Sequence, residues 1–449
     1  MLRRTEPATP LIEHHVPADL HERARLGNGR PRKVHVAILV KNYQFGGTQR
    51  VLTRLANKLH AYGHDVQVLS GGSGPLRAML CDGVEQIDLR PSGELPARFL
   101  ALRCNPGAFG RLVRPVLLPI YPVKALRLLR PLTGYLAAAQ PEVLIAATAG
   151  LNVVASLAKR RAAVDTALVM TEHVSLDQRR IDDRRWARRF LPDLMRSTYA
   201  DADAIVAVSS GVKEGLCTLL DLPQERVRCI YNPAVPDDID ALIREPVEHP
   251  WFTAGEPPVV LSAGRPGRTK DFATLLHAFV RVRAQQRSRL VLLSSAARGS
   301  LQEKQLGELR GLAESLGVQD DFAILDFTDN PFRYMARAGV FASSSTSEGF
   351  GNVVAEALAC GCPVVSTMTE GPAEVLDNGR YGRLVPVGDE VAMARALVEA
   401  LHAPRNSARL ALRAAAFSEE RAGRAYEALC CELVFPNAPR AHVHATTSG

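Results

Sequence analysis

The stretch VHVAILVKNYQFGGTQRVLTRLANKLHAYGHDVQVLS, residues 34–70, decides the fold class of this chain. Its first seven residues are apolar except for one histidine, which is typical of a strand buried on both faces of a parallel sheet. After a glycine-containing turn, the side chains of Val51, Leu55 and Leu59 fall on one face of a helix, and a second apolar run follows. The stretch therefore predicts one β-α-β unit of a doubly wound α/β sheet.

Further apolar runs alternate with helical stretches along the rest of the chain. In the first half they lie at 143–147, 167–171 and 204–208, and a second series starts at 259–263 and continues near 290, 322, 340, 364 and 384. The pattern predicts two doubly wound domains, over 33–232 and 233–416, with an irregular linker near 233–255. We expect a loose basic leader over 1–32, which is polar and lacks a sustained period, and a disordered tail over 435–449.

Length, cysteine content and charge narrow the class of protein. The 449 residues are too many for one ordinary domain, and a hydrophobic fraction of 47% supplies ample core. Eight cysteines without metal-site spacing fit reduced thiols in the cytoplasm. The amino terminus lacks the apolar core of a secretion signal, and no run of about eighteen apolar residues occurs, so we expect a cytoplasmic protein with no membrane span. The net charge of +8 allows nucleic acid, anionic lipid or phosphate-bearing ligands.

A strand, a loop and a helix are predicted over FASSSTSEGFGNVVAEALACGCPVV, residues 341–365. Glu348 follows the strand, at the carboxyl end where open α/β sheets bind ligands, and Glu356 lies about one turn into the helix. The glycines between them let the backbone approach a ligand, and Asn352 can cap a helix whose free amides favour an anion. The stretch therefore predicts a phosphate site flanked by two carboxylates. The spacing alone would more often indicate a pair of solvated surface glutamates, and the strand, glycines and cap around it favour the site.

A second candidate element is AGRPGRTKDF, residues 263–272, which joins a predicted strand to a predicted helix. Arg265 can hold a diphosphate through its planar fork, and Lys270 can hold it as a point charge from another side. We assign no role to Arg268. An Arg and a Lys on a loop are usually solvated, so the position after the strand, together with the glutamate motif, favours phosphate binding.

The stretch around the two glutamates resembles the donor-site signature of family 4 glycosyltransferases, which are retaining enzymes that use nucleotide sugars. The likeness continues through DNPFRYMARAGVF at 329–341 and TEGPAEVLDNGRYGRLVPVGD at 369–389, as in members that build bacterial surface polysaccharides and lipid-linked oligosaccharides. It implies the GT-B architecture, with two facing Rossmann-like domains and a cleft between them. It also implies a helix over 417–434 that crosses back to the first domain.

The resemblance also implies roles for individual residues. The residue matching Glu348 touches sugar hydroxyls, the residue matching Glu356 holds the ribose hydroxyls of the nucleotide, and the loop between them meets the sugar and diphosphate. The catalytic set is then Glu348, His173, Arg265 and Lys270, and the donor-binding set is Glu356, Gly349, Phe350, Gly351, Asn352, Val353, Gly46 and Gly47. His173, at the end of the strand ALVMT, would hydrogen-bond the transferred sugar and would not act as a base, because the leaving phosphate takes the acceptor proton. A histidine of the core or surface is the alternative.

Two departures from the family pattern affect the donor site. The segment LSSAARG, residues 293–299, lacks the glycine-acid-glycine turn that the family commonly has, which puts the contacts to the nucleotide base in doubt. Gly351 stands where some relatives carry proline, and we infer no loss of activity from it.

A metal role is not expected for Asp201-Ala202-Asp203, although these residues fit the Asp-x-Asp pattern of many metal-dependent glycosyltransferases. They precede a strand and read as a capping and solvated turn. We expect Arg265 and Lys270 to take the place of the metal, and we expect no cofactor besides the nucleotide sugar as co-substrate.

The acceptor is indicated only indirectly. Residues 98–140 carry seven Arg or Lys residues and no acid, interleaved with Leu, Ile and Phe and broken by proline. Such segments lie on anionic membranes, and an Arg-rich cluster at 179–190 could extend the same surface. We therefore expect a peripheral protein on the inner face of the cell membrane. A solvated basic helix on the first domain is the alternative.

Taken with the resemblance, the sequence predicts a retaining, metal-independent glycosyltransferase. We expect it to move a hexosyl or N-acetylhexosaminyl group from a UDP-sugar to a glycan or lipid-diphosphate-linked acceptor in cell-surface polysaccharide or lipopolysaccharide synthesis. A nucleotide-sugar epimerase or hydrolase of the same architecture, or a non-catalytic binding paralogue, remains as an alternative. No nucleic-acid partner is expected, because RNA-binding aromatic motifs and helix-turn-helix signals are missing.

Overall fold

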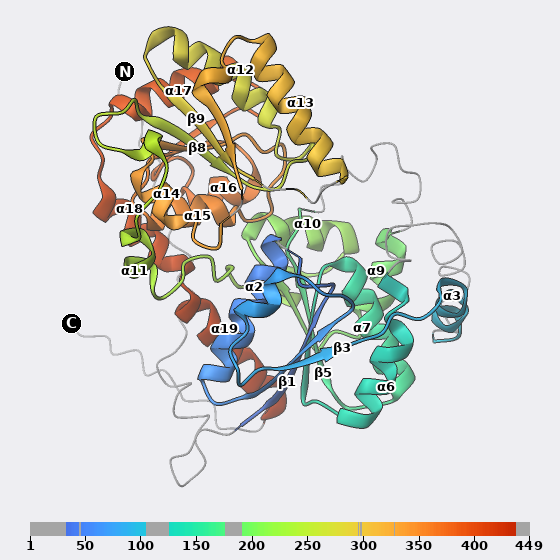
Figure 1. Ribbon diagram of the computed structural model, residues 1–449. Coiled ribbons are helices and arrows are strands. Elements are labelled where there is room, and N and C mark those ends of the chain that lie inside the picture. The colour runs from blue at the N-terminus through green and yellow to red at the C-terminus, as the bar shows by residue number, and fades with distance from the viewer. Residues whose placement is uncertain are drawn as a thin grey trace, which may run out of the picture.

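The protein consists of two α/β domains, one above the other in the computed structural model (Figure 1), which describes residues 33–44, 46–104, 125–175, 191–294, 296, 299–326 and 328–436. Each domain is built on one sheet whose strands all pair in parallel. This confirms the predicted fold class. The residue boundaries predicted for the domains stay predictions. The leader over 1–32 and all but the first two residues of the predicted tail over 435–449 lie outside the described residues.

The first domain has a seven-stranded sheet in the order β3-β2-β1-β4-β5-β6-β7. Its strands are β1 His35–Val40, β2 Asp65–Ser70, β3 Glu85–Asp88, β4 Val143–Ala147, β5 Ala167–Glu172, β6 Ala204–Ala207 and β7 Val227–Cys229. The two strands at the sheet edges, β3 and β7, are short and were not predicted. The order reverses between β1 and β4, and open sheets form a ligand crevice at such a point.

Helices cover both faces of this sheet. They are α2 Gly47–Ala61, α3 Glu94–Arg103, α6 Leu129–Ala139, α7 Ala149–Ala162, α9 Leu191–Tyr199 and α10 Ser210–Leu220, with short 3-10 turns at Pro75–Met79 and Gln224–Arg226. The predicted apolar face of α2 is buried at Val51, Leu55 and Leu59. No helix in the described ranges is long and apolar enough to cross a membrane.

The second domain has a six-stranded sheet in the order β10-β9-β8-β11-β12-β13. Its strands are β8 Val259–Ala263, β9 Arg289–Leu293, β10 Phe322–Leu325, β11 Val340–Ser343, β12 Val364–Thr367 and β13 Arg383–Val385. The helices around it are α12 Phe272–Gln285, α13 Leu301–Ser315, α14 Phe332–Arg337, α15 Asn352–Ala359, α16 Glu370–Val375, α17 Glu390–His402 and α18 Ser407–Ala414, with 3-10 turns at Gln319–Asp321 and Ala415–Phe417. All of the predicted strands of this half are present.

The linker is more ordered than predicted. It contains the short helix α11, Ile239–Arg244, and a 3-10 turn at Pro250–Phe252. α11 contacts α14 of the second domain, and the Asn330 side chain donates a 2.9 Å hydrogen bond to the carbonyl of Leu242. The expectation of an irregular segment was wrong because this tertiary contact stabilises a helix too short to be detected from its own periodicity.

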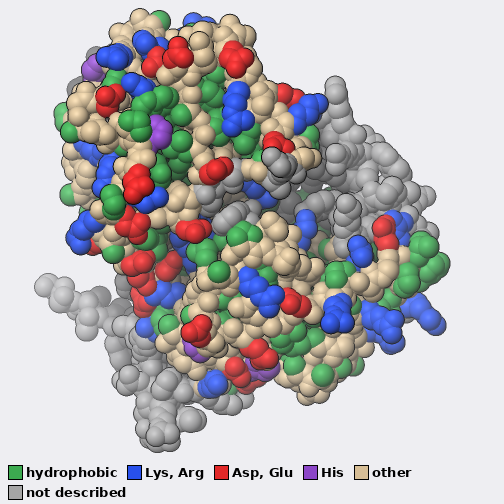
Figure 2. Space-filling view, viewed as in Figure 1, with side chains coloured by type: hydrophobic (Ala, Val, Ile, Leu, Met, Phe, Trp, Pro, Cys, Tyr) green, Lys and Arg blue, Asp and Glu red, His purple; other side chains and the backbone are tan. Residues whose placement is uncertain are grey.

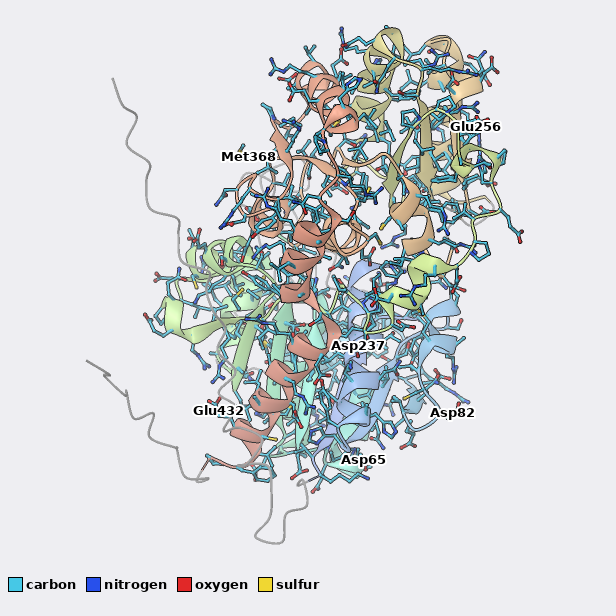
Figure 3. All side chains as sticks on the ribbon, turned by 90° about the vertical axis from the view of Figure 1, so that its left-hand side faces the viewer. Asp65, Asp82, Asp237, Glu256, Met368 and Glu432 are labelled. Atoms are coloured by element: carbon cyan, nitrogen blue, oxygen red, sulfur yellow. The ribbon has the colours of Figure 1, made fainter. Side chains whose placement is uncertain are left out.

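Helix α19, Glu419–Val434, starts at the second domain and runs down along the first (Figures 1 and 3). Its side chains Tyr426, Leu429 and Cys430 are buried in the core cluster that contains β1, β2 and α2. Where α19 begins, the chain runs beside the linker, since the amide nitrogens of Ala234 and Val235 each donate to the carbonyl of Phe417 at 3.0 Å. The two covalent crossings between the domains therefore lie side by side.

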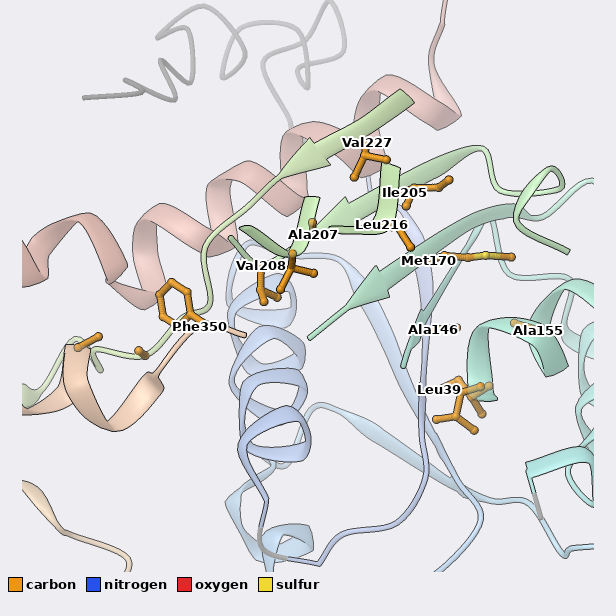
Figure 4. Packing of buried hydrophobic residues seen from close by; sticks show 14 of the residues in the cluster. Leu39, Ala146, Ala155, Met170, Ile205, Ala207, Val208, Leu216, Val227 and Phe350 are labelled. Atoms are coloured by element: carbon orange, nitrogen blue, oxygen red, sulfur yellow. The ribbon is translucent and has the colours of Figure 1, made fainter. Parts of the chain in front are cut away.

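The largest hydrophobic cluster is continuous across the domain interface. It includes first-domain strand residues such as Leu39 and second-domain residues such as Val375. Figure 4 shows Phe350 together with other members of this cluster. At the joint, the Phe350 ring packs against the rings of Tyr231 and Phe417, with centroids 5.8 and 5.4 Å away. Burial of this apolar contact holds the two domains facing each other.

Candidate functional site

One cavity of about 760 Å³ lies at the seam between the two domains and is lined by residues of both. From the first domain, Gly46, Gly47 and His173 line it. From the second domain come Arg265, Lys270, the loop from Glu348 to Val353, and Glu356. The structure thus brings all of the predicted site residues to one place, while the roles assigned to them stay predictions.

The topology of the second sheet explains why these loops meet. β8 and β11 are neighbours in the sheet, although β9 and β10 lie between them in chain order. The strand order reverses there, so the loops that leave the carboxyl ends of β8 and β11 face a common crevice. One loop carries Arg265 and Lys270, and the other carries Glu348.

Lys270 and Glu348 form an ion pair in the cavity. The Lys270 Nζ and Glu348 Oε2 atoms are 2.6 Å apart, and both side chains are about one-fifth exposed, at 22% and 23%. Gly264 adopts a φ of +151°, and a Cβ on it would lie 3.1 Å from Lys270 Cε, so glycine gives the lysine its room. The pair places a cation and a carboxylate side by side in the cavity, at the loop between β11 and α15.

Arg265 is an exposed residue that lines the same cavity. Its Nη2 atom would lie 3.1 Å from a Cβ placed on Gly46, which puts the guanidinium directly across the seam from the turn before α2. Arg268 is also exposed but does not line the cavity. Two cations of the second domain therefore reach the cavity from one loop.

The loop between β11 and α15 passes very close to the end of β5. A Cβ on Gly349 would lie 2.7 Å from the carbonyl oxygen of His173, and the Ser209 hydroxyl donates to the Gly349 carbonyl at 2.6 Å. Gly351 has a φ of +88°, in the left-handed region that glycine prefers. The side chain of Phe350 points into the interdomain core, so this residue can serve a ligand only through its backbone.

Asn352 does not cap α15 through its side chain, and this prediction was wrong. Gly351 occupies the N-cap position without a side-chain hydrogen bond, and Asn352 is already the first helical residue. Its Oδ1 atom instead accepts a 2.9 Å hydrogen bond from Asn232 Nδ2, from the far side of the seam. The amino-terminal residues of α15 still line the cavity, where the helix dipole favours an anion.

Glu356 projects from α15 into the cavity and is 2% exposed. Its Oε1 atom lies 3.2 Å from Nη1 of Arg50, a residue of α2 in the first domain. Arg50 ends the Gly46-Gly47-Thr48-Gln49-Arg50 turn, which resembles a family motif bordering the cleft, but no individual role was predicted for it. When the partner of a buried carboxylate lies on the other domain, the local sequence around the carboxylate does not indicate it.

His173 is a buried and neutral histidine. Burial lowers the pKa of its imidazole from 6.5 to about 4, and a side-chain interaction with Asn232 opposes this shift. Its Nε2 atom lies 3.0 Å from the Thr171 hydroxyl, whose single hydrogen is donated to the carbonyl of Ala146 at 3.1 Å. These contacts fix the orientation of the ring beside Thr171 and Asn232.

A second buried titratable group, Glu172, precedes His173 in β5 and was not singled out from the sequence. Burial raises the pKa of its carboxyl from 4.5 to about 7, while hydrogen bonds from Tyr199 and Asn152 act in the opposite direction. The Asn152 amide donates to it at 2.8 Å, and the Tyr199 hydroxyl donates as well. Glu172 does not line the cavity, so it supports the end of β5 from within the core.

The Asp201-Ala202-Asp203 turn lies elsewhere and is occupied by ion pairs. Asp201 accepts from Arg160, and Asp203 accepts from Lys159 at 2.7 Å. Within the ranges that the structure describes, no group of three or more His, Cys, Asp or Glu side chains is arranged to hold a metal ion. In the segment that departs from the family pattern, Ser295, Ala297 and Arg298 lie outside the described residues, and Ala296 lines the cavity.

Comparisons with known proteins match both domains. Residues 45–238 match the family described as "Glycosyltransferase Family 4", and residues 257–403 match the one described as "Glycosyl transferases group 1". A relative from Campylobacter jejuni, N-acetylgalactosamine-N,N'-diacetylbacillosaminyl-diphospho-undecaprenol 4-alpha-N-acetylgalactosaminyltransferase, is 31% identical over 210 residues, covering 46% of this chain and 53% of that protein. The lipopolysaccharide core biosynthesis glycosyltransferase LpsE of Rhizobium meliloti is 32% identical over 202 residues, covering 45% and 54%. The chain thus spans about half the length of these curated relatives.

A solved structure agrees over nearly the whole chain. Anabaena HepE in complex with UDP and glucose superimposes with a TM-score of 0.64 at 20% identity, covering 86% of this chain and 95% of that one. At this identity the likeness shows the fold alone. With both domain families matched in order and the same two-domain fold around one shared cavity, the chain belongs to the group 1, family 4 glycosyltransferases of the GT-B fold.

Proposed function

We propose that this protein is a retaining, metal-independent glycosyltransferase that moves a sugar from a nucleotide-sugar donor, a UDP-sugar, to a glycan or lipid-diphosphate-linked acceptor. The observation that carries the proposal is the Lys270–Glu348 ion pair, which lies with Arg265 and Glu356 in the interdomain cavity. Cations for a diphosphate and carboxylates for sugar and ribose hydroxyls are the groups that such a donor requires.

The two cations would stabilise the leaving group. As the bond between the sugar and the diphosphate breaks, negative charge develops on the phosphate oxygens, and the Lys270 ammonium and the Arg265 guanidinium are already positioned beside the cavity. The amino terminus of α15 adds backbone amides to the same region. This arrangement supplies the charge that a divalent metal would otherwise provide, so we propose no metal and no cofactor besides the donor.

Glu348 and His173 would act on the transferred sugar. The neutral ring of His173, which lines the cavity, can hydrogen-bond a sugar hydroxyl, and Glu348 can accept hydrogen bonds from other hydroxyls once the donor diphosphate competes for Lys270. With the histidine neutral and hydrogen-bonded, we assign the acceptor proton to the leaving phosphate, as the family resemblance implies. The new bond would then form on the face that the phosphate leaves, which retains the anomeric configuration.

Names of relatives support a UDP donor and a lipid-linked acceptor. The Anabaena structure contains UDP and glucose, the Campylobacter jejuni relative is named for a diphospho-undecaprenol acceptor, and the Rhizobium meliloti relative is named for lipopolysaccharide core biosynthesis. We therefore place the protein in cell-surface polysaccharide or lipopolysaccharide synthesis, as a hexosyl- or N-acetylhexosaminyltransferase. Nucleic acid is not proposed as a partner.

A membrane-facing surface would bring the enzyme to such an acceptor. Leu95 and Phe99 of α3 are 67% and 63% exposed, and Figure 2 shows hydrophobic side chains beside Lys and Arg side chains at this end of the first domain. Most of the basic segment after α3, and the Arg-rich cluster at 179–190, lie outside the described residues. We propose peripheral attachment of this end to an anionic membrane, on the inner face of the cell membrane.

The test is a transfer assay with labelled UDP-glucose, UDP-galactose, UDP-GlcNAc and UDP-GalNAc and a lipid-diphosphate-linked saccharide extract. We expect label to enter the lipid fraction from one of these donors and not to appear as free sugar when the extract is left out. Free sugar or a 2-epimer formed without acceptor would favour the hydrolase or epimerase alternative. Donor binding without any turnover would favour the non-catalytic paralogue.

A further inference from the structure

The two carboxylate oxygens of Glu356 have different surroundings. Oε1 lies 3.2 Å from Arg50 Nη1, whereas Oε2 is buried and has no hydrogen-bond partner among the described residues. A buried polar oxygen without a partner is costly, because it has lost its water and gained nothing in exchange. Since Glu356 lines the cavity, the missing partner of Oε2 fits a ligand that enters there.

Arg50 reaches this carboxylate from the opposite domain. It lies in the first turn of α2, its amide nitrogen donates to the Gly46 carbonyl at 3.0 Å, and its side chain is 14% exposed. The start of α2 is nearly in contact with the start of α15, since a Cβ on Gly47 would lie 3.2 Å from Asn352 Nδ2. This close approach is what allows the guanidinium to extend across the seam to Glu356.

Two more hydrogen bonds cross the seam to the same loop and helix. The Ser209 hydroxyl donates to the Gly349 carbonyl at 2.6 Å, and Asn232 donates to Asn352 at 2.9 Å. These two act on the backbone of the loop and on the first residue of α15. Of the three contacts, the one from Arg50 acts on a carboxylate that we assign to the donor.

We infer that Arg50 is a positioning residue for the nucleotide: it holds Oε1 of Glu356 so that Oε2 faces the cavity and accepts the ribose hydroxyls. The inference rests on the proposed function, because it takes Glu356 as the ribose-binding carboxylate. Removing the guanidinium would leave a buried carboxylate with no partner and free to turn. Ribose recognition then depends on both domains together, although the ribose-binding residue belongs to the second.

The test measures ribose recognition separately from overall affinity. Calorimetric titration of UDP, and of GDP and ADP in parallel, each beside its 2′,3′-dideoxy form, gives the affinity ratio that the ribose hydroxyls contribute. Hydrogen bonds from these hydroxyls to a carboxylate should make the ratio about ten- to a hundredfold in the unsubstituted protein. We expect Glu356→Gln and Arg50→Gln each to reduce it to about threefold or less, mainly by weakening the ribose form. The affinity ratio of Arg50→Lys, which keeps the charge but not the planar guanidinium, should lie between that of Arg50→Gln and that of the unsubstituted protein.

Lys58→Gln is the matched control. Lys58 lies on the same helix, two turns further along, and pairs with Glu420 of α19 and Asp237 of the linker outside the cavity, so this variant loses an equal charge and a comparable ion pair. It should keep the full affinity ratio. Thermal melting of each variant shows whether it is folded. If Arg50→Gln does not fold, Arg50→Lys is compared with the unsubstituted protein instead.

Each other outcome overturns the inference. If the Arg50 variants weaken the ribose and dideoxy forms equally while Glu356→Gln abolishes the ratio, Arg50 binds phosphate directly or acts only on stability, and the proposed function stands. If the unsubstituted protein shows no ratio, Glu356 does not bind ribose. If it binds none of the three nucleoside diphosphates, the proposed donor site fails and the inference fails with it.

Discussion

Glu348 is the residue on which the proposed chemistry depends most directly, and Glu348→Gln tests it. The amide keeps the size of the side chain but removes the charge that pairs with Lys270, so it should lower kcat by roughly a hundredfold or more and leave the affinity for nucleotide nearly unchanged. Steady-state kinetics and calorimetry measure the two effects separately. Glu390→Gln, which breaks a surface pair with Arg281, should keep full activity. Wild-type turnover in Glu348→Gln would remove the basis for its role.

Lys270 carries the prediction of metal independence. Lys270→Ala should lose about 2–4 kcal/mol of transition-state stabilisation, because a cation beside the developing phosphate charge is removed. Addition of EDTA to the unsubstituted protein should leave the rate unchanged. The Arg268→Ala substitution, on the same loop but away from the cavity, should also leave the rate unchanged. Recovery of an EDTA-inhibited rate by magnesium or manganese would contradict the cation-based mechanism.

The buried carboxyl of Glu172 leads to a prediction of how the free energy of unfolding depends on pH. Burial raises its pKa from 4.5 to about 7, so the folded protein binds this proton more tightly than the unfolded chain does. Its contribution to the free energy of unfolding is complete below pH 4.5 and is lost as the pH rises through about 7. Glu172→Gln has no such titration, so the free energy of unfolding of the unsubstituted protein minus that of the variant should fall across this window. Urea unfolding at several pH values measures the difference, and a rise with pH would contradict the assignment.

At the scale of single residues, the sequence was informative wherever a side chain serves the loop that carries it. Glu348 and Lys270 could be predicted because each follows a recognisable strand in a local motif. The contacts of Arg50 and Glu172 could not be predicted, since the tertiary fold brings their partners to them from distant parts of the chain. Asn352 was assigned to its own helix because capping is a local rule, but an amide from the other domain is its actual partner.

Among the elements, the loop between β11 and α15 has the least space for change. Gly349→Ala would place a methyl group 2.7 Å from the His173 carbonyl, where backbone must shift to accept it. We expect kcat/KM to fall by roughly tenfold or more, because the loop that positions the donor is displaced. The control is Gly307→Ala in the interior of α13, where no atom lies within 4 Å of the added group. This control should keep its activity and gain about 0.5–1 kcal/mol of stability, and equal activity in both variants would mean that the close approach is unimportant.

The central strands and long helices could be predicted from periodicity alone, and the edge elements could not. β1, β4 and β5 are continuous apolar runs because helices cover both faces of them, and this burial is visible in composition. β3 and β7 have only four and three residues, are partly solvated, and carry polar side chains, so nothing in their sequence distinguishes them from loops. α11 is likewise stabilised by its neighbour α14 and not by its own pattern.

For the whole molecule, the proposed attachment to a membrane predicts a salt-dependent interaction. Vesicles containing acidic lipid should bind the protein at low salt and release it at high salt, because each cation near an anionic surface contributes about 1 kcal/mol that salt screens. Replacing the exposed Leu95 and Phe99 by serine should weaken this binding and the turnover of a membrane-embedded acceptor, and should spare donor binding in the other domain. Sedimentation with vesicles measures it.

The control for this surface is Leu412→Ser. Leu412 is 75% exposed on α18 of the second domain, so the variant removes a comparable apolar side chain from a face that we do not assign to the membrane. It should bind vesicles as the unsubstituted protein does. Binding that ignores salt, or that is equal for acidic and neutral lipid, would mean that α3 is an ordinary solvated surface.

The return of α19 to the first domain has a consequence for how the chain is made. Tyr426, Leu429 and Cys430 complete a core whose other members lie mostly before residue 210, and the whole second domain is translated between the two. A ribosome therefore releases the second domain before the first has its last helix. Nascent chains arrested before α19 should expose the apolar surface beside β1 and α2 to chaperones, and the amino-terminal domain should reach protease resistance only after the carboxyl-terminal one, the reverse of the usual order of synthesis.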